Sequence, residues 1–291
     1  MDKKISIKQM KGFLLNTGFP FEMAMDRKLR NLGYQVRMNY PFLDLDENKT
    51  REIDLLASKE INGVKVEFII ECKQSYRDTW IFIAPEERPK RFYTDVRHYP
   101  RIIDLKNQDK CFDHTHFYNR KYTLATRYIP YDGKKQSDSS PFNDAVSKVV
   151  KSTIYRISEN KGDKRIIFYP LILFSGKMFL AQYSKKLTLR KSVTIQYRHF
   201  FESKAYQEGE SAGGTDFASY DSTGRQLLDR TSREKQKRNK IREINDSLTS
   251  QHLVDIVNKS SLIQYIKAVE DEIMVIPQEY WISEVTIKNT T

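Results

Sequence analysis

Cysteines are scarce in this 291-residue sequence, and long apolar runs are missing from it. The two cysteines, Cys72 and Cys111, are too few for a disulfide framework or a four-thiolate zinc site. The only apolar run near the N-terminus, 13–15, is too short for the core of a signal peptide. No stretch approaches the roughly 18 apolar residues of a membrane span. These absences predict a cytoplasmic protein with reduced thiols and no membrane-spanning segment.

Charge is abundant, and its balance is basic. The sequence has 50 Lys and Arg against 38 Asp and Glu, which leaves a formal net charge of +12. Aromatic residues make up 12% of the chain, a content typical of a folded protein, because disordered segments are poor in aromatics. The positive charge favours a polyanionic partner, which is either nucleic acid or an anionic membrane surface.

The apolar spacing predicts alternating helices and strands. A helix is expected over 20–32, with Pro20 in its first turn and Gly33 just past its end. A strand is expected over 34–42. Further along, we expect a helix at 143–158, a buried hairpin of 165–174 with 178–183, strands at 193–201 and 253–257, and a helix at 261–273.

A second hairpin is predicted between 51–59 and 64–73, because Asn62-Gly63 is a favoured two-residue turn. In the register that this turn sets, the numbers of paired residues add up to 125, so Asp54 lies opposite Glu71. The remaining pairs are Glu52 with Lys73, Ile53 with Cys72, Leu55 with Ile70, and Ala57 with Phe68. One face of the hairpin is therefore expected to be apolar and the other to carry the charges.

Two carboxylates opposite one another on a sheet have Cβ atoms about 5 Å apart, and their like charges are destabilising. A divalent cation would resolve this conflict between Asp54 and Glu71. Oxygen ligands without thiolate or imidazole favour Mg²⁺ or Mn²⁺ over zinc. Lys73 projects to the same face, where it could hold a metal-bound water, and Glu22 on the first helix could add a further ligand.

Residues 51–57 (REIDLLA) and 68–73 (FIIECK) resemble the Asp…Glu-x-Lys core of the PD-(D/E)xK superfamily, the restriction-endonuclease-like nucleases. The similarity covers roughly 17–75 and 141–183, and it extends to the Mrr-type and Holliday-junction-resolvase-like branches, in which a Glu on the first helix completes the site. Ile53 stands where the name of the motif has proline. Many branches have Gln on the helix where this chain has Lys148 and Lys151.

The resemblance implies an α/β fold, in which a central mixed β-sheet is flanked by helices and a long insertion follows the Glu-x-Lys strand. It implies that Asp54, Glu71, Glu22 and the backbone carbonyl of Cys72 hold Mg²⁺, with Mn²⁺ as a substitute, and that Lys73 assists hydrolysis. Nucleic-acid contacts are expected from four cations, which are Arg51, Lys148, Lys151 and Arg238.

A single nuclease domain is expected over 1–291. Its core comprises 13–75, 141–205 and 250–291, and an insertion without clear periodicity occupies 76–140. A basic, flexible segment occupies 206–249. Within the insertion, Cys111, His114 and His116 lie close together in sequence, but no second group of ligands accompanies them, so a loop is favoured over a zinc site.

The predicted activity is Mg²⁺-dependent hydrolysis of nucleic-acid phosphodiester bonds, with DNA as the first substrate and restriction, phage defence or repair as the setting. Two alternatives stay open. One is an RNase effector on the same fold, because the aromatic insertion could stack unpaired bases. The other is a non-catalytic nucleic-acid-binding protein on a decayed nuclease fold. The sequence leaves homo-oligomerisation and the identity of a partner protein open.

Overall fold

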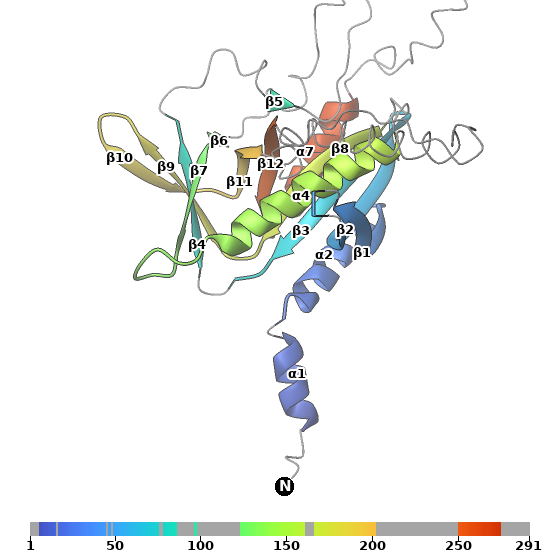
Figure 1. The fold of residues 1–291 in the computed structure, drawn as a ribbon, viewed down its shortest axis with the longest axis horizontal. Helices are drawn as coiled ribbons and strands as arrows, with labels where there is room; N and C mark the ends of the chain where they lie inside the picture. The colour runs from blue at the N-terminus through green and yellow to red at the C-terminus, as the bar shows by residue number, and fades with distance from the viewer. Residues whose placement is uncertain are drawn as a thin grey trace, which may run out of the picture.

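A central mixed sheet runs through the computed structural model, which describes residues 6–15, 17–44, 46–47, 49–75, 78–85, 96–97, 123–160, 166–201 and 250–274 (Figure 1). Its strand order is β1-β2-β3-β8-β12-β11-β6, and β5 pairs with β12. The strands are β1 Gln35–Asp44, β2 Lys49–Ile61, β3 Val64–Lys73, β5 Val96–Arg97, β6 Thr123–Ala125, β8 Ile166–Phe174, β11 Thr194–Phe201 and β12 Ser250–Asn258. The predicted mixed sheet is therefore confirmed.

The β2–β3 hairpin has the predicted register. Leu55 pairs with Ile70 and Ile61 with Val64, so the numbers of paired residues add up to 125. Positive φ angles at both turn residues (Asn62, 52°; Gly63, 73°) explain why the Asn-Gly turn fixes this register. The paired ladder ends at Leu55–Ile70, and the predicted pair of Asp54 and Glu71 lies just beyond it.

The expected apolar pair of Ile53 with Cys72 is wrong. Ile53 belongs to the core cluster on one face of the sheet, whereas Leu55 and Cys72 belong to the cluster on the other face. The alternation changes at Asp54, whose expected partner Asn39 has a φ of 49° and is missing from the β1–β2 ladder. Because of this irregularity, Ile53 points to the opposite face of the sheet from the one that the hairpin register predicts. The hairpin turn alone does not reveal this change.

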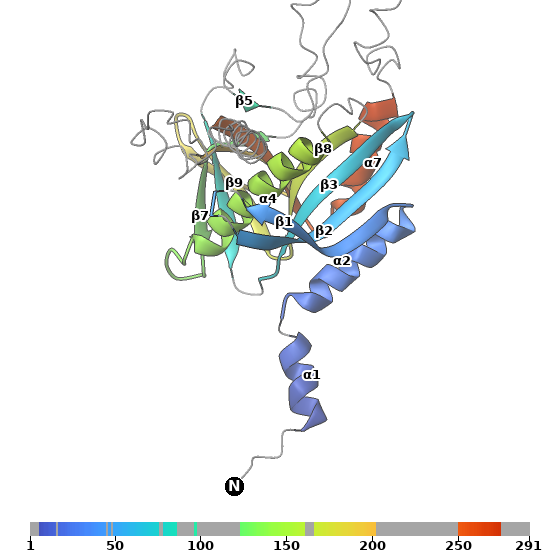
Figure 2. The same cartoon turned by 45° about the vertical axis from the view of Figure 1, so that its right-hand side comes forward.

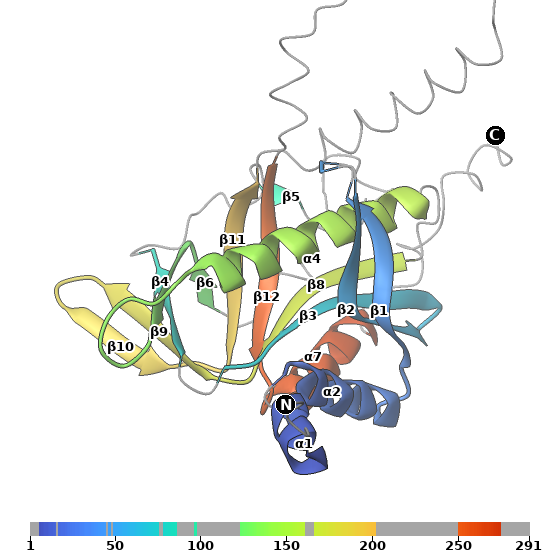
Figure 3. The ribbon, with the colours of Figure 1, turned by 60° about the horizontal axis from the view of Figure 1, so that its bottom comes forward.

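Helices cover the two faces of the central sheet (Figures 2 and 3). One face packs against α2 (Phe19–Asn31) and α7 (Leu262–Met274), and the other packs against α4 (Ser140–Glu159). These three helices confirm the predicted helices. The crossover from β3 through α4 to β8 makes β3 and β8 parallel neighbours, with Glu71 beside Ile172. The end of β3 thus lies in the middle of the sheet, covered by α4.

A second sheet of four strands has the order β10-β9-β4-β7. Its strands are β4 Thr79–Ala84, β7 Arg127–Tyr131, β9 Lys177–Tyr183 and β10 Leu187–Lys191. The predicted hairpin of 165–174 with 178–183 is therefore wrong, because β8 pairs with β3 and β12 while β9 pairs with β4 and β10. The chain changes sheet at Gly176, where an added Cβ would lie only 2.8 Å from the Asp78 carbonyl oxygen.

The segment predicted as an insertion contributes to the core. Trp80 and Phe82 of β4 are buried and pack with Phe142 of α4. The rest of that segment includes Cys111, His114 and His116, which lie outside the described residues, as does the basic segment 206–249.

One helix was not expected from the sequence. Helix α1, Ile7–Leu15, projects away from the sheets and buries none of its residues (Figure 2). No helix in the described part of the chain is both long and apolar enough to cross a membrane.

Candidate functional site

Two carboxylates and two lysines meet where the paired part of the β2–β3 hairpin ends. The Nζ atom of Lys148 on α4 lies 3.3 Å from Oδ1 of Asp54 and 2.8 Å from Oε2 of Glu71. The Nζ atom of Lys73 lies 3.0 Å from Oε1 of Glu71. The structure thus brings together Asp54, Glu71 and Lys73, as the sequence predicted, and adds Lys148 directly between the two acids.

The main chain of Cys72 also belongs to this site. Its N–H donates a hydrogen bond to Oδ2 of Asp54 at 2.7 Å, which fixes the carboxylate of Asp54 beside β3. The Cys72 side chain points into the core on the opposite face, and burial raises the pKa of its thiol well above the usual value. Any contribution of Cys72 to the site therefore comes from its backbone.

The acids of the site repel one another. Glu71 is only 2% exposed, and its pKa is raised first by burial and then by the charge of Asp54. The pKa of Glu22, on α2, is raised by partial burial and by the charges of Asp54 and Glu71. Glu22 therefore lies within the electrostatic reach of the pair. No three Asp, Glu, His or Cys side chains among the described residues are close enough together to hold a metal ion.

The positively charged ammonium group of Lys148 lies between the carboxylates of Asp54 and Glu71. Burial alone would lower the pKa of its ammonium group, but the charges of Glu71 and Asp54 outweigh burial and raise that pKa. The two carboxylates thus already share a monovalent cation. A pair of carboxylates that converges on one cation suits Mg²⁺ or Mn²⁺, because Mg²⁺ is usually held by one or two carboxylates, waters and substrate phosphates. Among the described side chains, the implied metal would thus have two carboxylate ligands, and its other ligands would come from the backbone, water or substrate.

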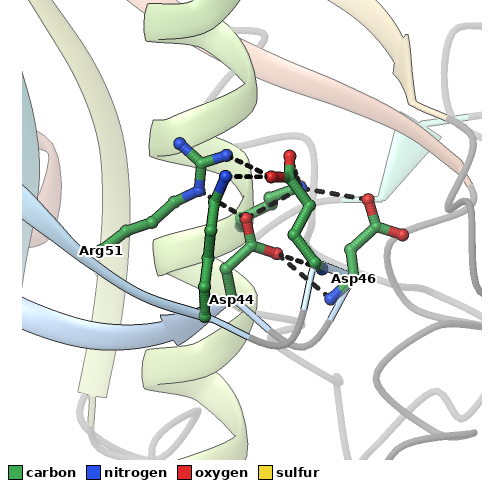
Figure 4. A network of polar contacts seen from close by, with 6 residues as sticks. Asp44, Asp46 and Arg51 are labelled. Carbon is green, nitrogen blue, oxygen red and sulfur yellow. Dashed lines mark hydrogen bonds and ion pairs between the residues drawn. The ribbon is translucent and has the colours of Figure 1, made fainter.

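Two of the predicted nucleic-acid contacts lie elsewhere. The Lys151 side chain is 5% exposed, and its Nζ atom is 3.0 Å from one carboxylate oxygen each of Asp44 and Asp46. Nε of Arg51 lies 2.7 Å from Oδ2 of Asp44. Figure 4 shows Asp44, Asp46 and Arg51 converging at the β1–β2 turn beside α4. Lys151 and Arg51 thus stabilise this turn, and Arg238 lies outside the described residues.

A third cation of α4 also reaches the sheet. Arg156 makes two hydrogen bonds to Oε2 of Glu67 on β3, from Nε at 3.1 Å and from Nη2 at 2.9 Å. Lys148, Lys151 and Arg156 therefore each pair with a different group of acids on β1–β3. No local pattern in the sequence indicates these pairs, because the partners lie many positions apart and come together only when α4 crosses the sheet.

Three comparisons with known proteins give no identification of the chain. Comparison of the chain with protein-family models, with curated proteins and with solved structures found no significant match. The function must therefore be inferred from the geometry and charge of the site.

Proposed function

We propose that this protein is a metal-dependent nuclease of the restriction-endonuclease-like type. The observation that carries the proposal is the convergence of Asp54 and Glu71 on one cation position, with Lys73 beside Glu71. The order α2, β1, β2, β3, α4, β8 and the parallel pairing of β3 with β8 agree with the fold that the sequence resemblance implies. Asp54, Glu71 and the Cys72 carbonyl would hold Mg²⁺ or Mn²⁺, with Glu22 as an outer acid.

Each residue of the site would have a separate role in phosphodiester hydrolysis. A divalent ion held there would polarise a phosphoryl oxygen and lower the pKa of a water molecule. The Cys72 N–H keeps the carboxylate of Asp54 in place. Lys73, anchored to Glu71, can hold the attacking water and balance the negative charge that grows on the phosphate in the transition state.

Nucleic acid is the expected substrate, and DNA is the first choice. The net charge of +12 favours a polyanion, and most proteins that share the Asp…Glu-x-Lys motif act on DNA. Restriction, phage defence and repair are the settings that this resemblance implies. Incubation of the purified protein with Mg²⁺ and circular duplex DNA, linear duplex DNA, single-stranded DNA or RNA tests the proposal, and we expect cutting of DNA circles. No cleavage of any of these substrates in Mg²⁺ or Mn²⁺ would contradict a nuclease.

The position of Lys148 favours a second candidate, which is a non-catalytic nucleic-acid-binding protein. Its ammonium group satisfies both carboxylates without a metal. The two candidates differ in what happens when this ammonium group is removed. In a nuclease the lysine is a competitor that a divalent ion displaces, whereas in a metal-free binding protein it is a permanent partner of the acids.

Replacing Lys148 with Gln should weaken the metal-free protein and strengthen its binding of Mn²⁺. Loss of the cation leaves Asp54 and Glu71 with less compensation for their repulsion, which should lower the free energy of unfolding by about 2–3 kcal/mol. With the competitor gone, the Kd for Mn²⁺ should fall by about tenfold. Calorimetric titration with Mn²⁺, and thermal unfolding with chelator or Mn²⁺, measure both effects.

Lys267→Gln is a matched control, because Lys267 is an exposed lysine of α7 and has no ion pair in the described part of the chain. It removes the same charge without touching the site. Equal Mn²⁺ affinity in the parent and in Lys148→Gln would favour the binding protein over the nuclease.

A further inference from the structure

The second sheet has one buried face and one open face. Paired residues of neighbouring strands lie on the same face of a sheet. Trp80 pairs with Met178 and Phe82 with Leu180, and these four side chains are buried in the cluster beneath α4. The alternate residues, beginning with Ile81 of β4, therefore form the opposite face, which no described helix covers.

This open face is apolar and aromatic. Ile81 pairs with Ile129 of β7 and with Phe179 of β9, which in turn pairs with Lys191 of β10. Further out, Tyr183 pairs with Leu187. The face holds Tyr131, Ile129, Ile81, Ile83, Phe179, Tyr183, Leu187 and Leu189. Tyr183 is 63% exposed, Leu187 67% and Leu189 56%. Such a surface on a chain this polar indicates a binding site.

The charges of the β9–β10 hairpin, on one side of the open face, are all positive. Residues 177–191 contain five Lys or Arg and no Asp or Glu. Lys177 and Lys191 lie on the face itself, and Lys185 and Lys186 are exposed at the β9–β10 turn. The described residues provide no carboxylate partner for these four lysines. Figures 1 and 3 show that the β9–β10 hairpin extends beyond the rest of the two sheets.

We infer that the open face of the second sheet binds a single strand of nucleic acid. Exposed aromatic rings on a sheet stack on unpaired bases, and flanking lysines neutralise the phosphates. A protein partner fits less well, because lysines are depleted at protein–protein interfaces. A base pair inside a duplex does not offer its ring faces, so the aromatic residues select an unpaired strand. The inference rests on the proposed function only in taking nucleic acid as the ligand, since binding here needs no metal.

The open face is firmly connected to the carboxylate site. Strand β4 follows β3 along the chain, and β9 follows β8 after a short connection. The N–H of Ser175 donates a hydrogen bond to the carbonyl oxygen of Lys73 at 3.1 Å, and the N–H of Ser75 donates one to Oγ of Ser175 at 3.0 Å. These bonds hold together the two connections that lead from the central sheet to the second sheet, one from β3 to β4 and the other from β8 to β9. A strand held on the open face would therefore stay at a constant distance from Asp54 and Glu71.

Fluorescence anisotropy of the full chain in chelator tests this inference, with labelled oligo-dT, oligo-U and a mixed-sequence duplex as probes. We expect tighter binding of the single strands than of the duplex. Tyr183→Ala should weaken single-strand binding by about tenfold, while Tyr183→Phe, which keeps the ring, should bind like the parent. Tighter binding of oligo-dT assigns a DNA strand and tighter binding of oligo-U an RNA strand, and either result supports the inference.

The salt dependence of single-strand binding tests whether Lys185 and Lys186 contact phosphates. In Lys185→Gln/Lys186→Gln, the slope of log affinity against log salt should flatten by about 1.4, since each lost phosphate contact on a single strand contributes about 0.7. Lys259→Gln/Lys267→Gln removes two exposed lysines, one in the turn before α7 and one on α7, and should leave the slope unchanged. The measurement is made in chelator, where metal-dependent cleavage cannot occur, so this assay succeeds or fails independently of cleavage.

Two results would overturn the inference. One is parental single-strand affinity in both Tyr183→Ala and the Lys185/Lys186 variant. The other is a dimer, measured by light scattering, that Leu187→Glu dissociates, because the open face would then be an interface between two copies of the chain.

Discussion

Asp54→Asn should reduce Mg²⁺-dependent cleavage by about a thousandfold while leaving the metal-free protein as stable as the parent. The substitution removes the charge that would hold the metal, and with it several kcal/mol of stabilisation of the transition state. The fold should tolerate it, because the amide oxygen of Asn can still accept the hydrogen bond from the Cys72 N–H. Loss of the carboxylate also relieves repulsion that raises the pKa of Glu71.

Thermal unfolding separates the two effects. Mg²⁺ or Mn²⁺ should raise the midpoint of the parent but not that of Asp54→Asn, because only the parent should bind the ion in its folded state. Ca²⁺ should support DNA binding without cleavage, since it prefers looser coordination than Mg²⁺. Full cleavage by the purified Asp54→Asn protein would place the chemistry elsewhere and exclude the proposed site.

Lys151→Met should be among the most destabilising single substitutions in the described part of the chain. It removes a buried ammonium group and leaves the buried carboxylates of Asp44 and Asp46 with less compensation. Removing one partner of a buried ion pair typically costs about 3–5 kcal/mol. We expect the lower end of that range, because Arg51 still pairs with Asp44. Denaturant unfolding in chelator measures the loss.

Lys49→Gln provides the matched control for this cluster. Lys49 pairs with Glu47 at the same turn, but half of its side chain is exposed. Exposed ion pairs contribute less than about 1 kcal/mol, so the control should unfold close to the parent. If Lys151→Met is no less stable than Lys49→Gln, the buried cluster does not stabilise the fold in the way its geometry indicates.

Local signals in the sequence predicted much of the fold. Helical spacing of apolar residues located α2, α4 and α7, and Asn62-Gly63 set the register of the β2–β3 hairpin correctly. Each of these features depends on residues close together in the chain. The same hairpin placed Asp54 near Glu71 and Lys73, which is why three residues of the candidate site could be predicted.

The errors arose where distant segments decide the structure. The run 165–183 looked like a hairpin because Ser175-Gly176 separates two apolar stretches, yet β9 pairs with β4, a strand from a segment without clear periodicity. Lys148 and Lys151 could be placed on one helix. Their different partners, Asp54 with Glu71 and the acids of the β1–β2 turn, depend on how α4 crosses the sheet.

The three ion-paired cations of α4 also affect how fast Lys148 can leave Asp54 and Glu71. Lys151 and Arg156 fasten the helix to two acidic groups of the sheet, so sliding or rotation of α4 to move Lys148 would have to break both contacts. Sliding of a helix takes microseconds to milliseconds, whereas rotation about side-chain bonds takes picoseconds to nanoseconds in exposed residues and longer in a side chain that is only 24% exposed, as that of Lys148 is. Release of Lys148 from Asp54 and Glu71 is thus a motion of one flexible side chain on a fixed helix. The exchange of one cation for another between these carboxylates should then be much faster than any rearrangement of the backbone.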